Sequence, residues 1–177
     1  MLSVKRRDAT ALLSQREALI DLLLDAVENG ASVGFVLPLT REEAGRYWDS
    51  LLPSVANGSR LLWTALDGAG LVGSVQLELA TKKNGLNRAE VQKLLVRSRA
   101  RRGGVGRALM QALEAAALDL RRGLLYLDTE ARSGAEAFYR ALGYTCIGGL
   151  PDYACSPDGE WRANAIYSKT LFPRGTT

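Results

Sequence analysis

The segment from residue 89 to residue 120 constrains the fold more than any other part of the sequence. Ala89 to Val96 is an apolar-rich run with the length of a strand, and it leads into a loop of arginine and glycine. Beyond Gly104, apolar residues recur at the spacing of one helix face: Val105, Ala108, Leu109, Ala112, Leu113, Ala116 and Leu120. The sequence therefore predicts a strand joined by a glycine loop to a long amphipathic helix.

Strands and helices also alternate in the rest of the chain. The strand patterns cover residues 2–6, 61–66, 71–79, 123–128 ("GLLYLD"), 144–150 ("YTCIGGL") and 164–171 ("NAIYSKTL"). The helix patterns cover residues 12–26, stopped by Asn29-Gly30; 41–52, capped by Thr40 and Glu43 and ended by Pro53; and 135–142, closed by Gly143. The turn "DGAG" joins the second and third strands as a hairpin. This order predicts an α/β (α+β) fold with a mixed, mostly antiparallel central sheet flanked by helices.

Length and composition predict one cytoplasmic domain over residues 1–177. No repeat or linker divides the chain, and 47% apolar residues suit a packed core. No apolar run approaches the ~20 residues of a membrane span, and the N-terminus lacks a secretory pattern. Cys146 and Cys155 fit neither a disulfide framework nor a zinc site, so we expect two reduced thiols and no metal.

The absence of histidine limits the chemistry that this chain can perform. His-assisted Ser or Cys triads, HExxH metal sites and imidazole bases are all excluded. Any general acid or base must therefore be Asp, Glu, Tyr, Cys or Lys.

The loop before the long helix has the features of an anion site. Five arginines lie between residues 97 and 107, and Gly103, Gly104 and Gly106 let a ligand approach the backbone at the positive end of the helix dipole. A pyrophosphate would fit there, although the glycines could equally form a tight turn with solvated arginines around it. The P-loop pattern and the G-x-G-x-x-G dinucleotide pattern are both absent.

Two ordered motifs carry a resemblance to a known family. "RRGGVG" (residues 101–106) matches [Q/R]-x-x-G-x-[G/A], and "AEAFYRALGY" (residues 135–144) is similar to A-x-x-[LF]-Y-x-x-x-G-[FY]. With these motifs the chain resembles the GNAT-type N-acetyltransferases. The segments "NGLNRAEVQKL", "RGLLYLDTEA", "PDGE" and "AIYSKTL" bring the resemblance closest to the tabtoxin-resistance group of that family.

The resemblance implies acetyl-CoA as the acetyl donor. In that reading the main chain of Leu94, Leu95 and Val96 pairs with the pantetheine arm, and the turn holds the diphosphate with Arg101, Arg102, Gly103, Gly104, Val105, Gly106 and Arg107. The candidates for the nucleotide phosphate are Arg97, Arg99 and Arg102. One departure is Arg132, which stands where many members carry an asparagine that contacts the cofactor.

Transfer to an amine requires an acid for the departing thiolate and a group that accepts the ammonium or its proton. By the resemblance Tyr139 is the acid, whereas a plain core tyrosine is the alternative. Alternate residues of a strand share a face, so Asp128 and Glu130 point the same way. Asp128 is the first candidate for the ammonium and Glu130 the second, unless either caps the next helix. Trp48 is the aromatic residue expected to line the acceptor pocket.

We therefore expect an N-acetyltransferase that acts on a small-molecule amine, with tabtoxinine, a β-lactam amino-acid toxin, as the first candidate. A different small amine, a protein N-terminus or a non-catalytic acyl-CoA sensor remain the alternatives. Nucleic acid is not expected as a partner, because the arginines belong to a glycine turn and are not interleaved with stacking aromatics. We expect no membrane partner either, and the sequence leaves a homodimer open.

Overall fold

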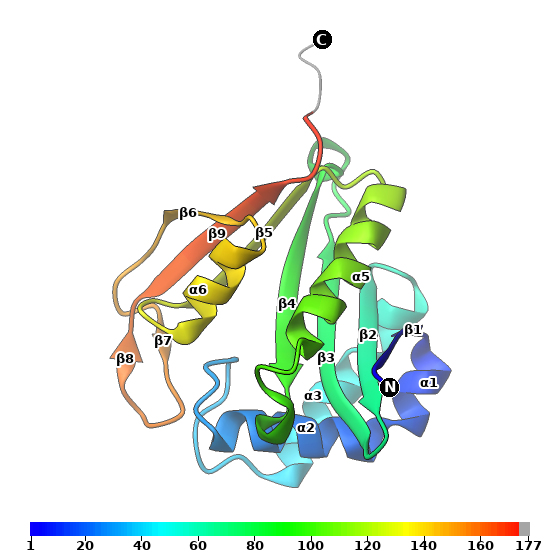
Figure 1. Cartoon of the computed structure of the whole chain (residues 1–177), viewed down its shortest axis with the longest axis vertical. Coiled ribbons are helices and arrows are strands. Elements are labelled where there is room, and N and C mark those ends of the chain that lie inside the picture. Colours follow the sequence, from blue (N-terminus) through cyan, green and yellow to red (C-terminus); the bar gives the residue numbers. More distant parts are fainter. Residues whose placement is uncertain (174–177) are drawn as a thin grey trace.

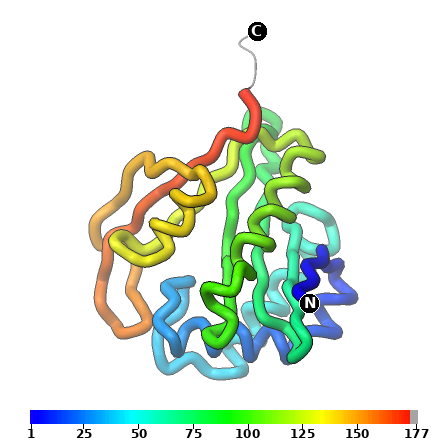
Figure 2. Tube along the Cα trace, viewed as in Figure 1, coloured from blue at the N-terminus to red at the C-terminus, as the bar shows by residue number. Residues whose placement is uncertain are grey.

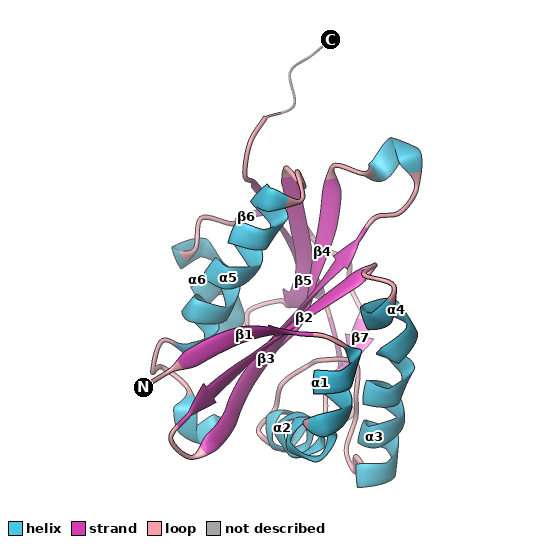
Figure 3. Ribbon diagram, turned by 90° about the vertical axis from the view of Figure 1, so that its right-hand side faces the viewer, coloured by secondary structure: helices cyan, strands magenta, loops and turns pink. Residues whose placement is uncertain are grey.

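The computed structural model describes residues 1–173 and contains a seven-stranded sheet with helices on both faces (Figures 1 and 3). Its elements are β1 (Ser3–Arg7), α1 (Ala9–Ser14), α2 (Arg16–Glu28), α3 (Arg41–Ser50), α4 (Leu52–Ala56), β2 (Arg60–Asp67), β3 (Gly70–Leu79), β4 (Arg88–Val96), α5 (Val105–Asp119), β5 (Leu124–Glu130), α6 (Gly134–Ala141), β6 (Thr145–Gly148), β7 (Ala154–Cys155), β8 (Trp161–Arg162) and β9 (Asn164–Thr170). Short 3₁₀ turns at Lys83–Gly85 and Ser98–Ala100 flank β4. The predicted mixed α/β sheet is confirmed.

The sheet has the strand order β1-β2-β3-β4-β5-β9-β6. Each neighbouring pair is antiparallel except β4 and β5, which are parallel and pair only where Arg88–Glu90 faces Leu124–Tyr126. Beyond Glu90 the two strands separate, and Figure 1 shows their ribbons fanning apart toward the carboxyl end of each strand. The sheet is therefore open along one edge of β4.

Two apolar clusters cover the two faces of the sheet. One joins the sheet to α5 and α6, with Trp63, Leu109 and Leu127 among its members, and the other joins it to the first four helices around Leu22 and Trp48. Successive strand residues serve opposite faces, as Leu62 and Trp63 do, because side chains along a strand point alternately to the two sides of the sheet.

The approach of α5 to the sheet depends on Gly73 in β3. A Cβ at this position would lie 2.9 Å from the carbonyl oxygen of Leu95, 2.9 Å from Val105 Cγ1 and 3.0 Å from Leu109 Cδ1. A glycine is therefore required for the helix to pack directly against the strand.

Two sequence predictions about local structure are corrected, and two short strands were not predicted. The predicted helix over residues 12–26 is two helices, α1 and α2, which are separated at Gln15 (φ −103°, ψ 7°). Pro53 does not end a helix but lies in the first turn of α4, where a proline needs no hydrogen-bond partner for its nitrogen. The strands β7 and β8, each of two residues, are too short to give a periodic signal.

Two further expectations concern the thiols and the membrane. Cys146 and Cys155 are both free cysteines, as predicted. Within residues 1–173, none of the helices combines the length and the apolar character that crossing a bilayer requires.

We predict that Gly73→Ala destabilises the fold by about 1–3 kcal/mol, because the added methyl group meets backbone and two packed side chains that cannot all move away. Urea unfolding monitored by tryptophan fluorescence measures this change. The matched control is Gly68→Ala in the β2–β3 turn, where a Cβ meets no atom within 4 Å, and there we expect a change below about 0.5 kcal/mol. Equal effects at the two positions would contradict the close approach of α5.

Candidate active site

The separation of β4 from β5 opens a cavity of about 800 Å³. Its walls come from elements that lie far apart in the sequence: the loop after α2 (Asn29 to Gly34), β4 (Glu90 to Leu94), the turn before α5 (Arg101 and Arg102), the end of β5 (Asp128 to Glu130), α6 (Ser133 to Ala135, Phe138 and Tyr139) and the segment around β7 to β9 (Tyr153, Ala154 and Arg162 to Asn164). The chain that follows α2 also approaches the β7–β8 hairpin (Figure 2). The Leu37 N–H donates to the Pro157 carbonyl there at 3.1 Å.

The turn before α5 borders this cavity through Arg101 and Arg102 and leaves the first backbone N–H groups of α5 without a partner among residues 1–173. Arg102 (φ 63°) and Gly104 (φ 82°) are both left-handed, and Gly104 is the N-cap residue of α5. The first N–H groups of a helix have no partner within it, and the first turn of α5 contains no acidic residue. Ser98 anchors the turn, because its N–H and hydroxyl both donate to Asp25 of α2 at 2.7 Å. The turn is thus held in place by Asp25, with the free N–H groups of a helix N-terminus beside it.

The five arginines of this segment have different roles. Arg97 donates through Nε to the Leu71 carbonyl at 2.9 Å, and Arg99 forms an ion pair with Asp67 at 2.9 Å. Arg101 makes a long hydrogen bond of 3.4 Å to the Asn29 carbonyl. The guanidinium groups of Arg102 and Arg107 have no such partner among residues 1–173. Of the three phosphate candidates, Arg102 is therefore the one whose side chain the fold leaves available.

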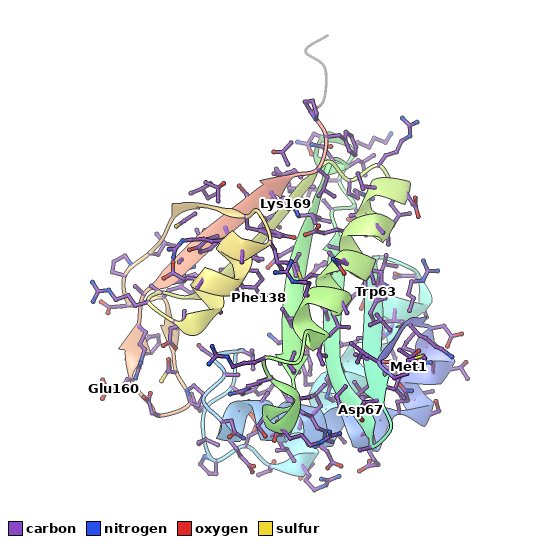
Figure 4. All side chains as sticks on the ribbon, in the orientation of Figure 1. Met1, Trp63, Asp67, Phe138, Glu160 and Lys169 are labelled. Atoms are coloured by element: carbon purple, nitrogen blue, oxygen red, sulfur yellow. The ribbon has the colours of Figure 1, made fainter. Side chains whose placement is uncertain are left out.

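Tyr139 lies on α6 with its ring in the core and its hydroxyl group at the cavity. The residue is 8% exposed, and its ring packs against Phe138, Tyr144 and Tyr167. Figure 4 shows Phe138 on the side of α6 that faces α5. No hydrogen bond of the Tyr139 hydroxyl to residues 1–173 is formed. Burial, and then the negative charge of Asp128, raise the pKa of Tyr139, so this phenol keeps its proton at neutral pH.

Asp128 and Glu130 lie on one face of β5, as alternation predicts, but their surroundings differ. Glu130 accepts from the Ser156 hydroxyl and pairs with Arg162 at 3.3 Å. Asp128 is exposed to the cavity, and its carboxylate has no hydrogen-bond or ion-pair partner in the described part of the chain. Neither carboxylate caps α6, whose N-cap residue is Ser133. Asp128 is thus the carboxylate with free acceptor capacity.

Trp48 does not have the position that the sequence suggested. Its side chain is fully buried among the first four helices and does not line the cavity, so the prediction that Trp48 contacts an acceptor is wrong. The helical period places Trp48 on the core face of α3. Burial of its large indole ring there stabilises the packing of α3 against the core. Arg132 stands where many members of the resembled family carry an asparagine, and its N–H donates to Glu136 Oε1 at 2.5 Å.

Sequence reasoning missed Lys93, which lies at a bulge of β4. The register pairs Gln92 with Gln76 and Leu95 with Ser74, so two residues of β4 oppose one of β3. Lys93 takes the left-handed conformation there (φ 49°) and lines the cavity. Burial lowers the pKa of its ammonium, and the charge of Asp128 is the largest opposing effect. A lysine inside the strand pattern "VQKLLV" was the available signal.

Comparison with known proteins agrees with this geometry. The model of the acetyltransferase (GNAT) domain family matches residues 58–146. Three similar solved structures are yncA from Salmonella typhimurium with its cofactor acetyl-CoA (TM-score 0.78, 13% identity, 100% of this chain and 98% of that one), a ribosomal-protein-alanine N-acetyltransferase from Brucella melitensis (0.76, 21%, 96% and 99%) and an aminoglycoside 6′-acetyltransferase type Ii (0.71, 23%, 98% and 99%).

At these identities the solved structures establish the fold, whereas the family model rests on the sequence itself. That model includes β4, the glycine turn, α5, β5 and α6, which are the elements that form most of the cavity, and it spans half of the chain. The chain therefore belongs to the GNAT acetyltransferase family.

Proposed function

We propose that this acetyltransferase moves the acetyl group of acetyl-CoA to the amino group of a small molecule inside the cavity between β4 and β5. One observation carries the proposal: a protonated tyrosine hydroxyl at Tyr139 and a free carboxylate at Asp128 face the same cavity, whose wall includes the turn at the N-terminus of α5. These are the groups that acetyl transfer to an amine requires.

The residues of the turn fit a pyrophosphate. Because Gly104 carries no Cβ and has no atom within 4 Å of where one would be, a phosphate can approach the N–H groups of Val105, Gly106 and Arg107. Arg102 adds a guanidinium group that has no partner among residues 1–173. Arg101, which precedes it in the chain, lines the same part of the cavity. The N–H group of Gly103 is already used in a 3.4 Å bond to Ala100, so Gly103 contributes mainly the shape of the turn.

The free edge of β4 fits the extended arm of the same molecule. Val96 pairs with Gly73 and Leu95 with Ser74 on the β3 side, whereas β5 has already separated from this part of β4. Main-chain groups of Leu94 and Val96 that point to the β5 side are therefore available to an added strand-like ligand. When bound, acetyl-CoA supplies an acyl thioester to the cavity.

The side chains divide the proton chemistry. Asp128 attracts the ammonium form of the acceptor and takes its proton, either directly or through water, and thereby yields the nucleophilic amine. Tyr139 holds a proton in a buried position and donates it to the departing thiolate sulfur. Glu130 is paired with Arg162 and accepts a hydrogen bond from Ser156, so its role is to hold the β7–β8 segment against β5.

We infer a small acceptor because the loop after α2 and the segment around β7 and β8 both line the cavity and are joined by the hydrogen bond from Leu37 to Pro157. The similar structures are named for acceptors as different as a ribosomal-protein alanine and an aminoglycoside, so the fold alone does not select one. The resemblance of several segments to the tabtoxin-resistance group makes tabtoxinine the first acceptor to assay, and the free amine of a protein N-terminus the second.

We predict that Tyr139→Phe lowers kcat by about 10²–10⁴-fold and leaves the Kd of acetyl-CoA nearly unchanged, since only the proton donor is lost. Thiol release and calorimetric titration measure the two quantities. Tyr144→Phe is the matched control, because Tyr144 is buried beside Tyr139 but does not line the cavity. A Tyr139→Phe enzyme with full activity would contradict the acid role and would favour a non-catalytic acyl-CoA sensor.

We predict that Gly104→Asp weakens acetyl-CoA binding by at least about tenfold, because a carboxylate then lies at the proposed diphosphate position. Gly104→Asn is the control: asparagine has nearly the same shape and tolerates the left-handed conformation equally well, but it carries no charge. Calorimetry with acetyl-CoA, repeated with CoA lacking its 3′-phosphate, measures the effect. Equal affinities of the two folded variants would place the diphosphate elsewhere.

A further inference from the structure

The ammonium group of Lys93 has no role in the chemistry described above, yet it lies at the wall of the same cavity. Its Nζ atom is 5.6 Å from the centroid of the Tyr47 ring, and it borders Gly34, where a Cβ would lie 3.4 Å from it. Among residues 1–173, no carboxylate approaches this nitrogen within the 4.0 Å of an ion pair. A half-buried lysine without a counter-ion is costly unless a ligand supplies one.

The backbone directs Lys93 to this position at some cost. Lys93 has a φ of 49°, and a residue with a Cβ is strained in this left-handed region, where such strain is commonly associated with function. The bulge breaks the alternation of β4, so that the side chain of Lys93 reaches Tyr47 of α3. Lys93 therefore reaches the face of the sheet that the first helices cover, opposite α5.

The charges around Lys93 come from three strands. Asp128 of β5 and Glu90 of β4 attract the ammonium, and Arg60 of β2 repels it. Arg60 is already paired with Glu78 at 2.5 Å, and the Tyr126 hydroxyl donates to Glu90 at 3.2 Å. Within residues 1–173, Lys93 and Asp128 are therefore two opposite charges of this half of the cavity that form neither an ion pair nor a side-chain hydrogen bond.

We propose that Lys93 binds the carboxylate of the acceptor, so that the acceptor is an amino acid whose amine is held at Asp128. This inference rests on the proposed function and adds to it the substrate class and the residue that selects it. A lysine ammonium is a compact point charge suited to a carboxylate. An acceptor with a second ammonium group would be repelled by Lys93, and one without an anionic group would leave Lys93 without a counter-ion.

The test uses a series of ω-amino acids, glycine, β-alanine, 4-aminobutyrate and 5-aminovalerate, each compared with the alkylamine that lacks its carboxylate. With the wild-type enzyme, kcat/KM should favour the best amino acid over its alkylamine by about 10- to 100-fold, which is the value of one charge-assisted hydrogen bond. Lys93→Gln should reduce this ratio toward one, mainly through KM, and Lys93→Arg should restore part of it.

The control variant is Lys5→Gln, which removes the same charge from an exposed position on β1. It should keep the wild-type ratio. A ratio near one in the wild-type enzyme, or a ratio that Lys93→Gln leaves intact, would overturn the inference while acetylation of the alkylamines would still support the proposed function. Loss of both rates by one common factor in Lys93→Gln would also overturn it, because selection by Lys93 must distinguish the two acceptors.

If no amine in the series is acetylated, calorimetric titration of the complex with CoA provides the second measurement. Binding of an amino acid that is lost in Lys93→Gln and kept in Lys5→Gln would support the anion site even though the transfer reaction had failed. Absence of binding to the wild-type complex would overturn the inference.

Discussion

The parallel pair β4–β5 is the constraint on which the rest of the site depends. These strands share a register only from Arg88 to Glu90, and the neighbouring antiparallel pairs then force them apart. Because a strand edge with unpaired N–H and C=O groups is costly when it is buried from water, the gap favours an extended ligand that completes the hydrogen bonding. In the proposed function, the fold forms its donor site by leaving its own sheet incomplete.

Charge is distributed unevenly along this gap. The wall formed by the α5 turn carries helix N–H groups and Arg102, whereas the β5 wall carries Asp128. In the proposed function, an anionic donor and a cationic amine are therefore attracted to different ends of one cavity, with Tyr139 between them. Lys93 is an exception to this division, because it adds a positive charge to the half of the cavity that contains Asp128. A positive charge there favours an acceptor that carries an anionic group.

The periodic segments of the sequence predicted their structure well, because burial enforces their pattern. The helix from Gly104, the strands around Val91 and Leu127, and the hairpin at "DGAG" all follow from alternation or helical spacing. Gln15 shows the limit of that method, since the apolar period continues through the break between α1 and α2 and gives no sign of the changed backbone angles.

The candidate site was predictable where it follows a local rule and not where it depends on tertiary packing. Alternation along β5 placed Asp128 and Glu130 on one face, but only the folded chain reveals that Ser156 and Arg162 engage Glu130. The bulge at Lys93 arises from the pairing of β4 with β3, and the sequence of one strand does not predict its register with the next. For Trp48, the amphipathic period of α3 indicated burial, and this counted against the predicted contact with an acceptor.

The donor turn and the proposed acid are linked through one packing contact. Gly106 lies in the first turn of α5, and a Cβ there would be 3.2 Å from Phe138 Cζ. The glycine therefore lets α6 lie against the start of α5, and Phe138 precedes Tyr139 in the chain, with their rings 5.3 Å apart. A larger side chain at residue 106 would push α6 away and move the Tyr139 hydroxyl with it. In the proposed function, the glycines of this turn therefore serve two purposes: Gly104 leaves room for the phosphate, and Gly106 allows the packing that positions Tyr139.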